Sequence, residues 1–231
     1  MSISCVRVPA TKTANAAVIF VHGLGDSGDG WSWLPQFVRQ TGLVKSHAEV
    51  NYIFPNAPIL PITANGGMAM AGWFDIYEFG NPRARQDVAG FFKSCEVIKL
   101  LVKEQIEKHN ISPERIILGG FSQGSALCMA VLSLLDVKIG GLVAISGFCL
   151  VAEALLEKCD KTGVNFDTPV FQGHGTADPL VPLDFGKHVR DLYKGLGYKN
   201  WDFRTYAGVA HSTNEAELID VVKFLALILD K

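Results

Sequence analysis

Long apolar stretches are missing from this sequence. It contains no run of about 18 consecutive apolar residues, which predicts that no helix spans a membrane. The first ten residues, MSISCVRVPA, lack the apolar core of a secretory signal. Serine rather than glycine follows the first methionine, which excludes N-myristoylation. A reversible acyl group on Cys5 is the one lipid anchor that stays open.

An excess of charge of one sign is also missing. Lys and Arg together number 21 and Asp and Glu number 23, so the net charge is −2. Such a balance gives neither nucleic acid nor an anionic membrane an electrostatic reason to bind. We therefore expect no nucleic-acid partner and at most transient contact with a membrane surface.

Cysteine is scarce, odd in number and never spaced as C-x-x-C, which argues against a disulfide framework and against a zinc site. The five are Cys5, Cys95, Cys128, Cys149 and Cys159. We expect reduced thiols, as in a cytoplasmic protein. With 231 residues, 48% of them hydrophobic, the chain can bury a large core without disulfides or a structural metal. No linker or repeat interrupts it, so we expect one domain over residues 1–231, with no metal and no cofactor.

Short apolar runs alternate with amphipathic stretches along the chain. Strands rich in Val and Ile that alternate with helices indicate a mostly parallel sheet with helices on both faces. The expected strands are 16–21, 52–54, 115–119, 138–145, 168–172 and 201–206, and the expected helices are 86–109, 123–135 and 218–229. Residues 212–215 (STNE) fit a capping box before the last helix. Segment 57–73 is long for a structureless connection, and such loops are usually functional.

The sharpest local pattern is a G-x-S-x-G motif at residues 120–124, between an expected strand and an expected helix. A nucleophilic serine must stand clear of the backbone on a tight strand-to-helix turn, where only small neighbours fit. The helix that follows directs its N–H groups and positive dipole end at the developing oxyanion. The alternative is a glycine-rich turn with a surface serine, which would not require a strand before the motif and a helix after it. We predict a serine hydrolase of the α/β-hydrolase fold, without a separate lid domain, in which Ser122 is the nucleophile.

Serine at neutral pH is a poor nucleophile and needs a neighbouring base. In the predicted fold the chain order is nucleophile, then acid, then base. His211 follows the last expected strand, where this order requires the base. His188 lies in an expected helix and His174 precedes the best acid, so we expect structural roles for both. The predicted base is His211.

The acid must leave a strand end on the same edge of the sheet. Asp178 does so in QGHGTADPLVP, just after strand 168–172. Asp184 resembles a charge at a helix start. Asp160 and Asp167 precede the strand and would lie at its wrong end. We predict that Asp178 holds the imidazole in the correct tautomer and stabilises its cationic form.

The second oxyanion donor in such enzymes comes from the loop after an early strand. Segment 21–26 (VHGLGD) has that place, and its glycines let backbone N–H groups approach a substrate oxygen. The predicted donors are the N–H groups of Leu24 and Gln123. A phosphate loop is the alternative, but neither phosphate-binding glycine motif is present and two aspartates would repel phosphate.

Seven segments in this order resemble the acyl-protein thioesterase / lysophospholipase / small carboxylesterase family, and most closely its fungal thioesterase type. They are VHGLGDSGDGW, FPNAP, GWFDI, RIILGGFSQGSAL, ISGF, GHGTADPLVP and GVAHS. The resemblance covers about residue 16 to the C-terminus. It implies hydrolysis of palmitoyl thioesters on protein cysteines through an acyl-enzyme, with Ser122, Asp178 and His211 as the triad. Lipid-like esters are further implied substrates.

Two alternatives stay open beside the thioesterase. A carboxylesterase or lysophospholipase would cleave oxygen esters with the same residues. A non-catalytic binding protein could use the same fold, although a complete triad in the right order disfavours it. For assembly and location we expect a monomer or weak homodimer in the cytoplasm and also in the nucleus.

A long acyl chain needs an apolar groove leading away from the serine, since each buried methylene contributes about 0.8 kcal/mol. In open α/β folds such grooves lie at the carboxyl ends of the strands. The candidates are Leu24, Met68, Met70, Trp73, Phe148 and Leu180. The alternative is that these residues pack the core, and Trp73 in particular could anchor its own loop.

Overall fold

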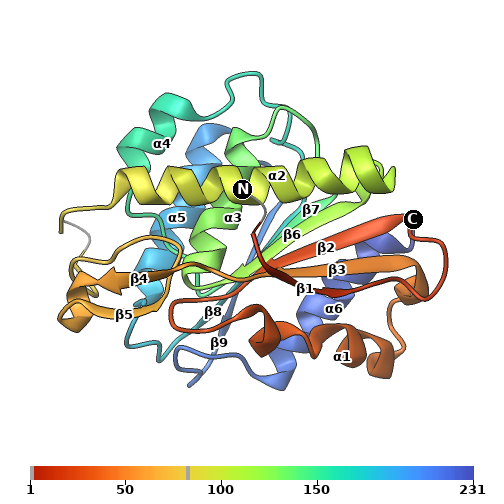
Figure 1. The fold of residues 1–231 in the computed structure, drawn as a ribbon, viewed down its shortest axis with the longest axis horizontal. Coiled ribbons are helices and arrows are strands. Elements are labelled where there is room, and N and C mark those ends of the chain that lie inside the picture. The colour runs from red at the N-terminus through yellow and green to blue at the C-terminus, as the bar shows by residue number, and fades with distance from the viewer. Residues whose placement is uncertain (1–2, 82–83) are drawn as a thin grey trace.

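The computed structural model describes residues 3–81 and 84–231, and a twisted sheet runs through the centre of the molecule (Figure 1). Its strand order is β1-β3-β2-β6-β7-β8-β9. Neighbouring strands are parallel, except that β1 at the edge is antiparallel to β3. The strands are β1 (Cys5–Val8), β2 (Ala16–Val21), β3 (Val50–Pro55), β6 (Ile116–Phe121), β7 (Gly141–Ile145), β8 (Val170–Gly175) and β9 (Trp201–Tyr206).

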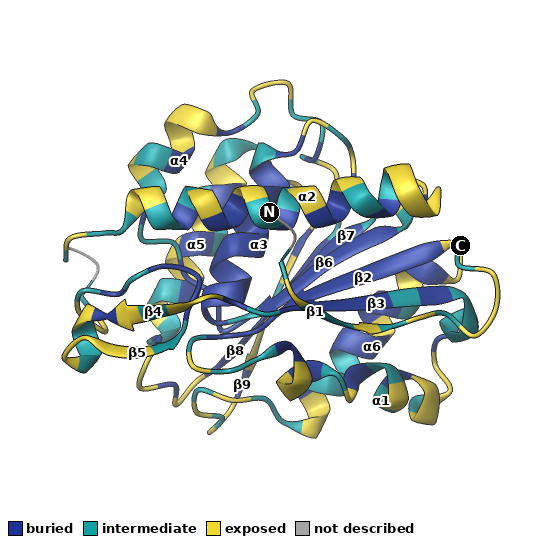
Figure 2. Ribbon diagram, viewed as in Figure 1, coloured by how far each residue is buried: buried dark blue, intermediate teal, exposed yellow. Residues whose placement is uncertain are grey.

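Helices cover both faces of the sheet (Figure 1). On one face lie α2 (Val88–His109), α3 (Gln123–Leu134), α4 (Ala152–Lys158) and α5 (Leu183–Leu196), and on the other lie α1 (Leu34–Thr41) and α6 (Glu215–Leu229). The central strands are buried on both sides, with Leu118 in one core and Ile117 in the other (Figure 2). Such strands must be apolar throughout rather than alternating. This architecture confirms the predicted α/β-hydrolase fold.

Most expected elements are present, with small shifts at their ends. Strands 16–21 and 201–206 have the predicted bounds. Helix α2 begins at Val88, because the Asp87 carboxylate caps it by accepting from Gly90 N. The capping box predicted at 212–215 is wrong: Asn214 is the N-cap of α6 and its side chain accepts from Glu217 N. Strand β1 and helix α1 were not predicted.

The long connection at 57–73 is a small antiparallel hairpin rather than an irregular loop. Strand β4 (Ile59–Ile62) pairs with β5 (Met68–Ala71), and the turn between them contains two glycines with positive φ, Gly66 and Gly67. Ala71 O accepts a hydrogen bond from Gly25 N, which ties the hairpin to the loop after β2. The hairpin therefore lies beside the carboxyl ends of the strands.

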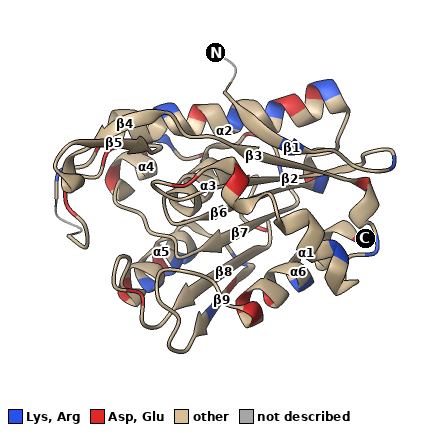
Figure 3. Cartoon of the chain, turned by 60° about the horizontal axis from the view of Figure 1, so that its bottom comes forward, with Lys and Arg blue, Asp and Glu red and all other residues tan. Residues whose placement is uncertain are grey.

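Charged residues lie mainly on the outer helices, where both signs occur close together along the chain (Figure 3). Several are paired one helical turn apart, as in Lys99–Glu96 and Lys187–Asp184. Exposed pairs of this kind add little stability but keep the surface hydrated. Among the described residues, no helix is both long and apolar enough to cross a bilayer.

Candidate active site

Ser122 occupies a strained turn between β6 and α3. Its backbone has φ 54° and ψ −118°, and its N–H donates to Ile145 O on the neighbouring strand. Non-glycine residues adopt such a conformation only where the surrounding structure imposes it. Gly120 and Gly124 make the turn possible, because a Cβ on either would collide with backbone atoms. The motif therefore presents the Ser122 hydroxyl beyond the end of the strand, as predicted.

The structure brings together the three residues of the predicted triad. His211 Nε2 lies 2.9 Å from Ser122 Oγ, and His211 Nδ1 lies 2.7 Å from Asp178 Oδ2. They come from three separate connections, β6–α3, β8–α5 and β9–α6, which meet at the carboxyl edge of the sheet. This linear arrangement is the one in which an imidazole can take the proton of a serine hydroxyl.

The rejected acids lie elsewhere. Asp184 is exposed at the start of α5 and forms an ion pair with Lys187. The Asp160 carboxylate accepts from the backbone of its own turn, and Asp167 pairs with Lys199. None of these three aspartates forms a hydrogen bond or ion pair with His211, whereas the Asp178 carboxylate does.

The Asp178 carboxylate is buried but well solvated by the protein. Its Oδ1 accepts from the backbone N–H groups of Leu180 and Val181, at 2.9 and 2.8 Å, which leaves Oδ2 for His211. Burial alone would raise the pKa of Asp178, but the hydrogen bonds from His211, Val181 and Leu180 outweigh it and lower the pKa below its usual value. The Asp178 carboxylate is therefore ionised and can stabilise the positive charge that His211 acquires when it takes a proton.

The two predicted oxyanion donors have no competing acceptor. Gln123 is the first residue of α3, and Leu24 lies in the loop after β2. Among the described residues, neither backbone N–H donates a hydrogen bond to another group of the chain. The N-terminus of α3 adds its positive dipole end at the same place. Both N–H groups are available to a substrate oxygen.

A buried histidine that sequence reasoning missed fixes the oxyanion loop. His22 Nδ1 donates to Gly23 O at 2.6 Å, while its Nε2 accepts from Ala57 N at 3.1 Å. These two bonds define the neutral Nδ1–H tautomer. Burial lowers the pKa of His22, which keeps the ring uncharged. Its position directly before Gly23 in the oxyanion loop is the sequence feature that could have indicated this role.

Trp73 is a correction to the predicted groove. Its side chain is only 2% exposed, and its indole N–H donates to His22 O at 2.9 Å. Its backbone N–H donates to the Gln123 side-chain oxygen, whose amide in turn donates to Phe74 O. Trp73 thus anchors the segment after β5 to both oxyanion loops and does not face the substrate. A large indole with a buried N–H needs such a partner.

An apolar cavity of about 390 Å³ opens at Ser122 and His211. Its volume lies within the range of small-molecule sites. Leu24, Met70, Phe148 and Leu180 line it as predicted, but Met68 does not: its side chain is 64% exposed on β5. Met68 and Met70 are two residues apart on β5, so their side chains leave the strand on the same side. They differ in position along the strand: Met70 is next to Ala71, which is tied to Gly25, whereas Met68 lies beside the turn of the hairpin. Further apolar lining residues are Ile76, Phe79, Phe121, Leu150, Val181 and Phe185.

Comparisons with known proteins identify the family. The family model described as phospholipase/carboxylesterase matches residues 3–229. The chain belongs to this family. Acyl-protein thioesterase 1 of Candida albicans is 60% identical over the full length of both chains, and that of Saccharomyces cerevisiae is 45% identical over 95% of this chain and 96% of its own. The crystal structure of Zea mays acyl-protein thioesterase 2 superposes with a TM-score of 0.83 at 26% identity, covering 98% of this chain and 99% of that one.

In this phospholipase/carboxylesterase family member, the sequence predicted three residues that the structure brings together, but it did not predict all of the cavity. Phe121 could have been found, because it immediately precedes the nucleophile at the turn. Ile76 and Phe79 carry no signal of their own, since they reach the site only through the path of the chain after β5. Phe185 lies in the first turn of α5, where an apolar residue is equally typical of core packing.

Proposed function

We propose that this chain is a serine hydrolase that removes long-chain acyl groups from cysteine thioesters on proteins. One observation carries the proposal: the hydrogen-bonded series Ser122–His211–Asp178 ends in an apolar cavity rather than in open solvent. The names of the relatives, acyl-protein thioesterases at 40–60% identity, support acylated proteins as the substrates.

The reaction proceeds in two steps. His211 Nε2 takes the Ser122 proton while Oγ attacks the thioester carbonyl carbon, and the oxyanion accepts hydrogen bonds from Leu24 N and Gln123 N. The C–S bond then breaks and His211 returns the proton to the departing cysteine sulfur. Water, deprotonated by His211, next attacks the carbonyl carbon of the acyl-Ser122 ester. The bond from that carbon to Ser122 Oγ then breaks, His211 returns the proton to Oγ, and the fatty acid leaves. Asp178 stabilises the imidazolium in both steps.

The cavity supplies the selectivity for a long chain. Its lining is mostly apolar and includes Leu24, Phe148 and Leu180. Each methylene that leaves water contributes about 0.8 kcal/mol, so a palmitoyl chain gains much more than an acetyl group. Met70 can adapt to a flexible chain because its side chain is unbranched and polarizable.

The same triad also supports a second function, the hydrolysis of oxygen esters by a carboxylesterase or lysophospholipase. The description of the matching family favours it directly. A serine nucleophile attacks both kinds of carbonyl, and no group beside Ser122 distinguishes sulfur from oxygen in the leaving group. The two functions therefore differ in the rest of the substrate and not in the chemistry.

The proposal includes the setting of the enzyme. Five cysteines without a disulfide suit the reducing cytoplasm and nucleus. We propose a monomer or weak homodimer that contacts membrane surfaces only transiently, which suits a net charge of −2. Cell fractionation and sedimentation at several concentrations test these points.

A substrate panel tests the activity. The measurement is kcat/KM for a palmitoyl-cysteine peptide, a lysophospholipid and a short-chain ester, each with Ser122→Ala as the blank. The thioesterase proposal expects the highest value for the palmitoyl peptide. A higher value for the lysophospholipid or the short ester would assign the chain to the second function, and no turnover of any of the three would contradict a hydrolase.

A further inference from the structure

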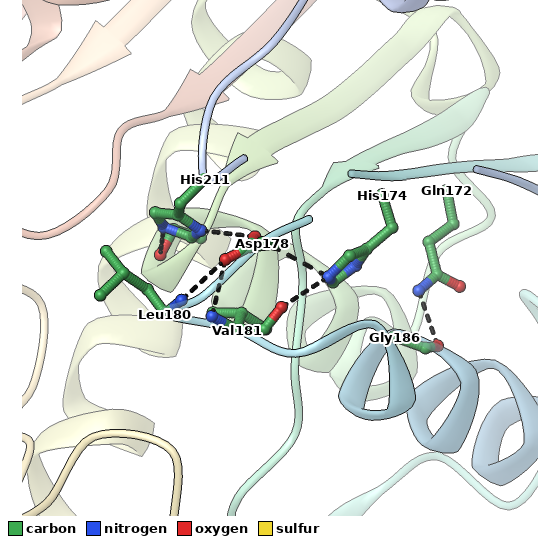
Figure 4. A network of polar contacts seen from close by, with 8 residues as sticks. Gln172, His174, Asp178, Leu180, Val181, Gly186 and His211 are labelled. Carbon is green, nitrogen blue, oxygen red and sulfur yellow. Dashed lines mark hydrogen bonds and ion pairs between the residues drawn. The ribbon is translucent and has the colours of Figure 1, made fainter. Parts of the chain in front are cut away.

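His174 lies behind the catalytic acid and has no part in the proposed reaction. It is the fifth residue of β8 and is completely buried, four residues before Asp178. Figure 4 shows its ring between Asp178 and α5, on the side of the carboxylate opposite His211. Its Nε2 lies 2.8 Å from Val181 O and 3.8 Å from Asp178 Oδ2. The ring thus contacts the turn that carries the acid rather than the substrate.

The hydrogen bond to Val181 identifies the tautomer. A carbonyl oxygen can only accept, so His174 Nε2 must carry a hydrogen and donate it. In the neutral ring Nδ1 then has a lone pair, and among the described residues it has no hydrogen-bond partner. Protonation would bury an N–H at Nδ1 without an acceptor. The surroundings therefore favour a neutral ring with its one hydrogen on Nε2.

Val181 links this bond to the carboxylate. Its carbonyl accepts from His174, while its N–H donates to Asp178 Oδ1 together with the N–H of Leu180 (Figure 4). His174 therefore holds the turn at 178–181 through the Val181 carbonyl. The same turn holds the Asp178 carboxylate through two of its backbone N–H groups. Oδ2 stays free for His211, 2.7 Å away.

We propose that His174, as a neutral Nε2–H donor, is a positioning residue: it fixes the 178–181 turn so that Asp178 presents Oδ2 to His211. The proposal rests on the triad of the proposed function and adds a residue that acts through the acid. No part of His174 reaches the substrate cavity.

Helix α5 holds the ring in place. A Cβ on Gly186 would lie 2.5 Å from His174 Nδ1, so only glycine allows the helix to pack this closely on the ring. Gln172, two residues before His174 on the same strand, donates to Gly186 O at 2.8 Å and accepts from the Trp201 indole (Figure 4). The ring therefore has one orientation available, which a positioning donor requires.

Neutrality of His174 matters to the reaction. The ionisable groups that act on it electrostatically are Asp178, in its own connection, and His211, in the β9–α6 connection, while α5 packs the uncharged Gly186 against the ring. Burial lowers the pKa of His174 more than Asp178 raises it. A charged His174 would compete with the His211 imidazolium for the Asp178 charge. An uncharged donor orients the Asp178 carboxylate without weakening its electrostatic attraction to the His211 imidazolium.

Two substitutions at His174 separate positioning from packing. Gln places an amide nitrogen at the position of Nε2 and keeps the donor, whereas Met has a similar size and no donor. We expect His174→Met to lower kcat roughly 10- to 100-fold with little change in KM, because a small misplacement of a catalytic group has that effect. The acid limb of its kcat/KM profile should move to lower pH, since a displaced Asp178 stabilises the imidazolium less. His174→Gln should recover most of kcat and the original pH profile.

Nuclear magnetic resonance of the unsubstituted protein gives an independent test that does not depend on a variant folding. The ¹⁵N shifts of the His174 ring should show the neutral Nε2–H form throughout the pH range of activity. An Nδ1–H form, or a ring that becomes charged within that range, would overturn the proposal. So would a His174→Met variant with the kcat of the unsubstituted enzyme, or equal losses in the Met and Gln variants. These results leave the triad intact, whereas an active Ser122→Ala variant would remove the proposed function itself.

Discussion

The buried triad and the apolar cavity adjoin each other but are built in different ways. Ser122 and Asp178 are 7% and 6% exposed, and hydrogen bonds of 2.7 to 2.9 Å hold their side chains to His211 and, for Asp178, to the backbone N–H groups of Leu180 and Val181. The cavity shares its rim with a two-stranded hairpin whose outer residues, Ile59 and Met68, are 69% and 64% exposed. Proton transfer requires distances accurate to a fraction of an ångström, while burial of an acyl chain requires only apolar area. The first region should therefore be far less tolerant of substitution than the second.

The largest effect should come from the nucleophile. We expect Ser122→Ala to lower kcat by roughly 10⁶ with little change in melting temperature, because it removes the attacking atom from an already formed turn. Ser125→Ala is the matched control, since Ser125 lies in the first turn of α3 and its hydroxyl has no hydrogen-bond partner among the described residues. A Ser122→Ala enzyme that keeps a tenth of its activity would contradict the assignment.

The acid should have the next largest effect. Asp178→Asn keeps the shape of the side chain but favours the wrong imidazole tautomer, so we expect kcat to fall by roughly 10⁴. Asp184→Asn, six residues later and exposed, should be silent. Steady-state kinetics of both variants decide the matter, and the opposite pattern would mean that Asp184 is the acid.

The cavity should give a smaller and more selective effect. Leu180 lines the cavity, so Leu180→Ser should raise KM for a palmitoyl substrate roughly 10- to 100-fold by removing apolar contact, and should leave an acetyl ester almost unchanged. Met68→Ser, on the same rim but outside the cavity, is the control and should alter neither. Equal losses on long and short chains would show that Leu180 supports the triad instead.

The smallest effect on the reaction should come from Glu217, a buried glutamate of α6 packed against Gly173 of β8. Burial, followed by the nearby Asp220 charge, raises the pKa of Glu217 to about 8. From about pH 4.5 to 8 the unfolded chain loses this proton while the folded chain keeps it, so the free energy of unfolding falls as the pH rises and stays low above pH 8. Glu217→Gln should therefore stabilise the protein at pH 9, by on the order of 2 kcal/mol, and hardly at pH 4.5.

Urea unfolding at both pH values measures this difference. The control is Glu215→Gln on the exposed side of the same helix, which should show no such dependence on pH. If the stability of Glu217→Gln showed no more pH dependence than that of Glu215→Gln, a raised pKa of Glu217 in the folded protein would be contradicted. Activity should be normal in both variants.

The fold and the reacting residues could be predicted because each depends on a local pattern or on chain order. Strand 16–21 is an uninterrupted apolar run, as a strand buried on both faces must be, and residues 120–124 specify a strained turn by their glycines. Once the order nucleophile–acid–base was assumed, only one aspartate and one histidine stood at strand ends on the right edge.

The substrate region was less predictable because its features depend on contacts. Segment 57–73 has no regular alternation, and its hairpin forms where Gly66 and Gly67 permit the turn. Trp73 is chemically as suitable for an apolar groove as for a core. Its indole contacts His22 O, 51 positions away in the sequence, and no local pattern reports such a contact. Met68 and Met70 lie two residues apart on one strand, and only the folded hairpin places Met70 at the cavity and leaves Met68 exposed beside the turn.

The sequence by itself determined the alternation of strands and helices and the turn that presents Ser122, because apolar periodicity and glycine spacing are local properties. It also nominated His211 and Asp178 as base and acid, by their order in the chain. Only the tertiary structure decided that His211 lies 2.9 Å from Ser122, that Trp73 anchors rather than binds, and that His174 lies behind Asp178. Each of these depends on side chains from separate connections meeting at one edge of the sheet, and packing between distant segments is what sets their distances.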